Sequence, residues 1–154
     1  MTAANEHFTA MLAEWLLSHP EVLQGSEERL QTLWLWHSAE EAEHKNTAFD
    51  LYAALGGNHH WRLVWFRRTT LAFLVDVTRQ VLSNLHRDGS LYRPSTWASA
   101  WRTLFGPAGL VRHIWRPWWA YRRRDFHPNQ QASNLSAQWL EHNRHRFTPV
   151  GETG

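Results

Sequence analysis

The segment from residue 27 to residue 55 constrains the fold of this 154-residue chain most strongly. Its apolar residues recur at alternating steps of three and four, which is the period of an α-helix with one buried face. Leucines lie at both ends of that face, and titratable side chains lie in its middle. The pattern predicts a long helix with one face towards a core. The residues on that face are Leu30, Leu33, His37, Glu40 or Glu41, His44, Thr47 or Ala48, Leu51 and Leu55.

The rest of the chain has the same helical period, and no segment shows the alternation of a β-strand. A first helix is expected over residues 3–18, because proline disfavours helix in the residue before it and His19 precedes Pro20. Ser26 is expected to cap the second helix, and Pro117 to kink the fifth. Further helices are expected over residues 60–86, 95–105, 109–123 and 134–146. The predicted fold class is therefore all-α.

The composition fits one folded domain. The hydrophobic fraction is 43%, which is enough for a core, and there is no cysteine. Disulfides, iron–sulfur clusters and thiolate zinc sites are therefore excluded. A metal would have to be bound by histidine and carboxylate, which suits iron, manganese or zinc. No signal peptide and no apolar run of membrane-spanning length is recognised, so a cytoplasmic location is expected.

Glu41 and His44 have the Glu-x-x-His spacing that dimetal carboxylate bundles use. His37, Glu41 and His44 are spaced by four and three residues, so all three project from nearly one face of the helix. Coordination of a metal would offset the several kcal/mol that a buried carboxylate costs. These residues are the first candidates for a metal site.

Such a site also needs a glutamate from a neighbouring helix, and the first helix offers Glu6. The same face continues through Ala10 and Ala13, whose small side chains would let two helices approach closely. The 35 residues between Glu6 and Glu41 are enough for an antiparallel hairpin with a short turn. The sequence therefore predicts a site built by Glu6, Glu41 and His44.

Other interpretations of these residues stay open. Glu40 rivals Glu41, because Glu40 and His44 are also one helical turn apart. The run of Glu40, Glu41 and Glu43 with Lys45 would also suit a solvated charged face. A single histidine is more often a hydrogen-bonded partner than a ligand, so His37 is an accessory position or a third ligand. Glu141 and His145 are expected to form an exposed pair at the end of the last helix.

Several motifs resemble the ferritin-like bacterial family of predicted metal-dependent hydrolases. They are Glu6 to Thr9, residues 36–45, residues 48–52 and Asp125 to Pro128. The resemblance implies that Glu6, Glu41 and His44 are metal ligands and that His37 is accessory. It also implies a divalent metal, with iron first and manganese or zinc as alternatives. The fold implied for residues 1–57 is a ferritin-like helical hairpin, which is half of a four-helix bundle.

Members of that family carry further glutamate and histidine motifs on helices that precede the one matching Glu6. The chain therefore resembles the C-terminal part of such a protein. Residues 58–146 would be accessory helices packed on the bundle, and residues 147–154 a flexible tail. The second half of the metal site would then come from a missing N-terminal helix pair or from a second copy of the chain.

The resemblance favours hydrolysis assisted by a metal-activated water. The same ligands would also suit a di-iron oxygenase or oxidase, and fold alone does not separate these chemistries. A third interpretation is a truncated, non-catalytic fragment or subunit that needs a partner helix pair. The sequence names no substrate and no catalytic residue beyond the metal ligands.

The later helices are rich in tryptophan and arginine. The chain has 11 tryptophans, and the only acidic residues between Glu43 and Glu141 are four aspartates. The first interpretation is packing of extra helices on the bundle, with arginines stacked on rings at the rim. The second is an amphipathic surface that contacts an anionic membrane, such as the inner membrane, from the cytoplasmic side. Nucleic-acid binding ranks third, because no recognised motif accompanies the basic residues.

Overall fold

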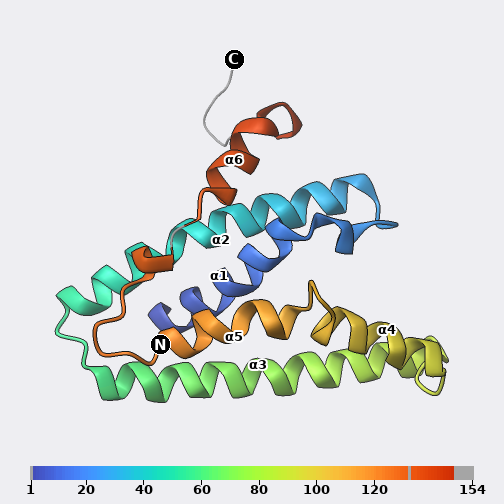
Figure 1. Ribbon diagram of the computed structural model, residues 1–154, viewed down its shortest axis with the longest axis horizontal. Coiled ribbons are helices and arrows are strands. Elements are labelled where there is room, and N and C mark those ends of the chain that lie inside the picture. The colour runs from blue at the N-terminus through green and yellow to red at the C-terminus, as the bar shows by residue number, and fades with distance from the viewer. Residues whose placement is uncertain (1, 132, 148–154) are drawn as a thin grey trace.

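A computed structural model describes residues 2–131 and 133–147, and those residues form helices and loops without a β-strand (Figure 1). The all-α prediction is confirmed. The α-helices are α1 (Thr2–Ser18), α2 (Glu28–Ala54), α3 (His59–Arg87), α4 (Pro94–Phe105), α5 (Leu110–Ala120) and α6 (Leu135–His142). Short 3₁₀ helices accompany them: η1 (Pro20–Leu23), η2 (Pro128–Gln131) and η3 (Arg144–Arg146).

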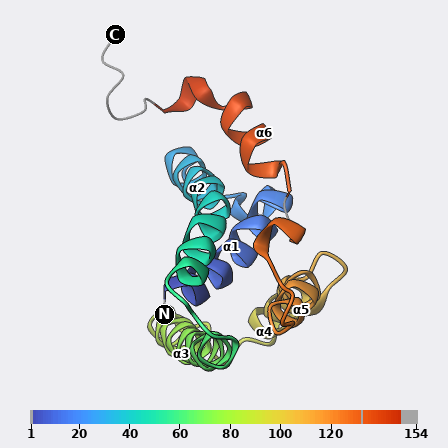
Figure 2. The same cartoon turned by 90° about the vertical axis from the view of Figure 1, so that its left-hand side faces the viewer.

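The helix α1 lies at the centre of the molecule. It forms an antiparallel hairpin with α2, while α3, α4 and α5 lie on its other side (Figures 1 and 2). The contact between α1 and α2 is lined by small side chains, since Ala10 and Ala13 of α1 and Ala39 and Ala42 of α2 are all buried. Small residues allow the two backbones to approach closely, and this closeness places the N-terminal half of α1 against the middle of α2.

The predicted buried face of α2 is wrong at both of its ends. Leu51 is 59% exposed and Leu55 is 79% exposed, and Leu30 and Leu33 are also exposed. The residues of α2 that are buried are instead Ser38, Ala39, Ala42, Lys45 and Phe49. The small-residue face pairs with α1, and this pairing turns the leucine face towards solvent.

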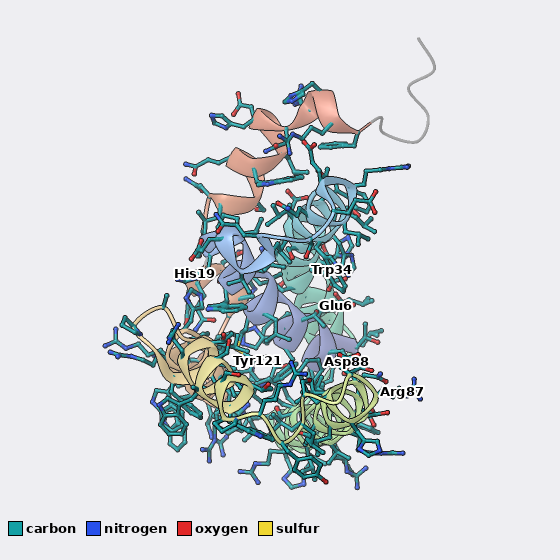
Figure 3. The ribbon with its side chains drawn as sticks, turned by 90° about the vertical axis from the view of Figure 1, so that its right-hand side faces the viewer. Glu6, His19, Trp34, Arg87, Asp88 and Tyr121 are labelled. Atoms are coloured by element: carbon teal, nitrogen blue, oxygen red, sulfur yellow. The ribbon has the colours of Figure 1, made fainter. Side chains whose placement is uncertain are left out.

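An aromatic cluster forms the main core, where α1, α3 and the end of α5 meet the last turns of α2. Its buried members include Phe8, Phe49, Phe66, Tyr121 and Phe126. The rings of Phe66 and Tyr121 are 4.3 Å apart between centroids. Tyr121 lies between α1 and the α4–α5 segment in Figure 3. This cluster fixes the start of α1, and with it the position of Glu6.

The helix ends differ from the prediction by a few residues, and the capping of α2 differs in kind. Ser26 does not cap α2, which begins after Glu27 without a side-chain hydrogen bond. The cap of α3 is Asn58, whose side chain accepts a hydrogen bond from the Trp61 amide. Pro117 lies within α5, which ends at Ala120 rather than at residue 123. The last predicted helix is divided at Asn143 into α6 and η3.

The predicted tail, residues 147–154, lies outside the described residues except for Phe147. The division of the rest into a hairpin unit and accessory helices stays a prediction. Within residues 2–131 and 133–147, no helix combines the length and apolarity that crossing a bilayer requires.

Candidate metal centre

The structure brings Glu6 of α1 together with Glu41 and His44 of α2. One ligand atom from each residue lies within 4.8 Å of the others. Glu6 and Glu41 are partly buried, whereas His44 is exposed. Glu6 lies on α1 at its boundary with α2 (Figure 3). The antiparallel hairpin therefore produces the grouping that the sequence predicted, and we call these three residues the triad.

The surroundings of Glu6 fit a cation. Its Oε2 atom is buried, and no described residue gives it a hydrogen bond. A buried carboxylate oxygen without a partner is costly, and a divalent ion at the triad would supply the missing partner. Two carboxylates and one imidazole form a ligand set that iron, manganese and zinc all accept.

The Glu41 carboxylate is held from both sides. Thr9 donates a hydrogen bond of 2.7 Å to its Oε2 atom, from one turn beyond Glu6 on α1. The other oxygen, Oε1, lies 3.7 Å from Nε2 of His37, whose side chain is 53% exposed. Glu40, the rival of Glu41, is not part of the grouped atoms. His37 lies beside Glu41 on the solvent side of α2, and its accessory role stays a prediction.

The comparison with known families agrees with this geometry. The model of a family described as predicted metal-dependent hydrolase matches residues 1–132. The chain belongs to this family. No curated protein and no solved structure matches the chain. The matched region contains the whole triad and extends through η2.

A buried ion pair beside the triad was missed by the sequence analysis. Lys45, the residue after His44, is only 4% exposed. Its Nζ atom lies 2.5 Å from Oε1 of Glu14 and donates a second hydrogen bond of 3.1 Å to the carbonyl of Gln131. The opposite charges of Glu14 and Lys45 were a usable signal, because both lie on the small-residue face that pairs α1 with α2. The Glu14–Lys45 ion pair joins α1 to α2 on the buried side of α2.

His7 follows Glu6 in sequence but belongs to the aromatic cluster. Its ring stacks on Tyr121 with centroids 4.4 Å apart. Burial lowers the pKa of His7 to about 3, so the ring is neutral at ordinary pH. The guanidinium of Arg62 is also buried here, 5.2 Å from the Tyr121 ring centroid, and it donates to the carbonyl of Arg123. His7 and Arg62 therefore lie among the rings of the aromatic cluster and are not part of the triad.

The last motif of the resemblance, Asp125 to Pro128, packs on the end of α2. Phe126 is part of the aromatic cluster. The Nε2 atom of His127 lies 2.8 Å from the Oδ1 atom of Asp50. The motif therefore supports the position of α2 from outside the triad. Glu141 in α6 and His145 in η3 are both exposed, and their pairing stays a prediction.

Proposed function

We propose that this chain is a metal-dependent hydrolase whose divalent ion is held by Glu6, Glu41 and His44. The observation that carries the proposal is the convergence of three ligand atoms from two helices within 4.8 Å. The family description supports the same chemistry. Iron is the first choice of metal because the family resemblance implies it, and manganese and zinc are alternatives that suit the same oxygen and nitrogen ligands.

A divalent ion in this position would supply Lewis-acid polarisation of a substrate and activation of a water molecule. The residues of the chain would orient that chemistry. Thr9 fixes one oxygen of Glu41 and so leaves the other directed towards His37. His44 is exposed, so a substrate would approach along the solvent side of α2. His37 lies on that side, beside Glu41.

The ferritin-like part of the proposal concerns how the triad is completed. Three protein ligands leave positions open, and dimetal carboxylate bundles combine two such sets from four helices. The exposed leucine face of α2 lies beside the triad and provides the apolar surface that a further helix pair would cover. We therefore propose that the α1–α2 hairpin is one half of a bundle of this kind.

Hydrolysis by the metal-loaded protein tests the proposed function. The purified chain, loaded separately with manganese, zinc and ferrous iron, would be assayed with nitrophenyl esters and nitrophenyl phosphates. We expect turnover that depends on one of these metals and is lost in Glu41→Gln. The control is Glu40→Gln, which removes a neighbouring carboxylate outside the triad and should retain activity. Oxygen consumption by the iron form, without hydrolysis by any metal form, would contradict the proposal.

A further inference from the structure

The helices α3, α4 and α5 expose far more apolar surface than the hairpin does. Of the 20 large apolar side chains exposed in the described residues, 14 lie between Trp61 and Trp119. On α4 the four such side chains, which recur at helical spacing on one face, are Trp97, Trp101, Leu104 and Phe105. Trp97 is 50% exposed and Trp101 is 67% exposed. This face has no cover among the described residues.

The C-terminal half of α3 shows the same property. Phe66 is the last buried residue of α3, and the helix continues for about six further turns to Arg87. Leu71, Leu74 and Val75 are exposed on these turns, as are Val77, Val81 and Leu82. In α5, Trp115 and Trp119 stack on each other at 5.5 Å between ring centroids, and both are exposed. Three neighbouring helices thus each present an open apolar face.

The charge of this region is strongly positive. Residues 59–125 contain 12 arginines and three aspartates, a net charge of +9 with histidine neutral. Several arginines adjoin the apolar faces and are exposed, including Arg68 on α3, Arg102 on α4 and Arg112 and Arg116 on α5. Arg122 lies over the Trp119 ring at 4.2 Å from its centroid. The apolar faces are therefore flanked by arginines that have few acidic residues near them in the sequence.

We propose that the outer faces of α3, α4 and α5 form a peripheral docking surface for a bilayer with anionic headgroups. Exposed tryptophans favour the boundary between headgroups and acyl chains, where their amphipathic rings are stable. Arginines beside them are attracted to the negative surface potential of anionic lipids. Amphipathic helices of this composition lie in the plane of the interface instead of crossing it. The combination of open apolar faces with flanking arginines selects the bilayer as the occupant.

The arrangement of the helices is compatible with docking and access to the triad at the same time. The surface helices α3, α4 and α5 lie on one side of α1, and α2 lies on the other (Figures 1 and 2). A bilayer against α3–α5 would leave the solvent side of α2, with His37 and His44, in water. This proposal does not depend on the identity of the metal or on hydrolysis.

Vesicle binding by the full chain at low salt tests the proposal. Cosedimentation would compare vesicles of phosphatidylcholine alone with vesicles that also contain phosphatidylglycerol. We expect at least about tenfold tighter binding to the anionic vesicles, and weaker binding as salt screens the charges. We expect Trp97→Ser with Trp101→Ser to weaken binding by about tenfold or more. The control is Leu51→Ser with Leu55→Ser. It removes two apolar side chains of α2 that are at least as exposed as the tryptophans, and this variant should bind as the parent does.

Further measurements separate a bilayer from other occupants. Circular dichroism would verify that each variant is folded, and hydrogen exchange should show protection of residues 71–82 and 97–105 on vesicles, with residues 30–37 unchanged. The proposal would be overturned by equal binding to both kinds of vesicle or by equal losses in the two double variants. It would also be overturned if the tryptophan pair mattered only for self-association or for binding of duplex DNA.

Discussion

The α1–α2 hairpin and the layer formed by α3, α4 and α5 differ in net charge and in the side chains that they bury. Residues 1–58 carry nine acidic and two basic side chains, a net charge of −7, whereas residues 59–125 carry a net charge of +9. The hairpin buries small residues and an ion pair along its contact, and it holds the triad. The layer buries a few large aromatic rings and leaves many apolar side chains in the open.

This difference indicates a division of roles. We propose that the acidic hairpin supplies ligands for a cation and that the basic layer supplies a surface for anions. The two regions share the aromatic cluster around Phe66 and Tyr121, to which both contribute side chains. Changes in the cluster should therefore damage the whole molecule, whereas changes in either region outside the cluster should damage one role.

The largest effect is expected from Phe66→Ala. Phe66 is almost fully buried between α1 and α5, and removal of a buried phenylalanine ring costs about 3–5 kcal/mol of unfolding free energy. Urea denaturation followed by circular dichroism would measure the loss. Trp101→Ala serves as the control, because this exposed ring should change the free energy by no more than about 0.5 kcal/mol. Equal losses would show that the two regions do not depend on a shared core.

A somewhat smaller effect is expected from Lys45→Met. This change leaves the carboxylate of Glu14 largely buried without its partner, which should cost about 3 kcal/mol of unfolding free energy. A double variant, Lys45→Met with Glu14→Leu, should recover most of that loss because no unpaired charge remains. A double-mutant cycle in urea would measure the coupling. Simple additivity of the two changes would show that the pair does not join α2 to α1.

The smallest effect on stability is expected from Thr9→Val. This change should act mainly on metal binding by the hairpin. The change removes the hydrogen bond that orients Glu41. Loss of such a supporting contact weakens metal binding by about tenfold or more, while stability changes by only about 1 kcal/mol. Calorimetric titration with manganese would measure the affinity. Thr47→Val, at an exposed threonine of α2, should leave the affinity unchanged; a similar loss there would contradict an orienting role for Thr9.

The sequence was sufficient for the helices and for the grouping of Glu6, Glu41 and His44, because helical spacing and a short hairpin connection determine both. It failed on the orientation of α2. Leu30, Leu33, Leu51 and Leu55 predicted a buried face, but the alanines of α2 pack on α1 instead. Close contact between two helix backbones favours small residues. The spacing of large apolar residues therefore does not predict which face of α2 packs on α1.

The burial of several polar groups was also not predicted, although the opposite charges of Glu14 and Lys45 gave a signal for one pair. Lys45 and Arg62 are buried because partners from distant segments surround them, namely Glu14, the Gln131 carbonyl and the Arg123 carbonyl. His7 stands next to a candidate ligand, yet its ring lies among aromatic side chains from α3 and the segment after α5. Such environments depend on tertiary contacts that local patterns do not specify.

The metal content of the purified chain tests the central claim most directly. Protein equilibrated with manganese, zinc or ferrous iron and then dialysed would be analysed by plasma mass spectrometry. We predict about one ion or more per folded chain, lost in the Glu41→Gln, His44→Gln double variant and retained in the Glu40→Gln, Glu43→Gln control. A folded parent chain without bound metal, or equal loss in both double variants, would contradict the assignment of Glu6, Glu41 and His44 as the ligands.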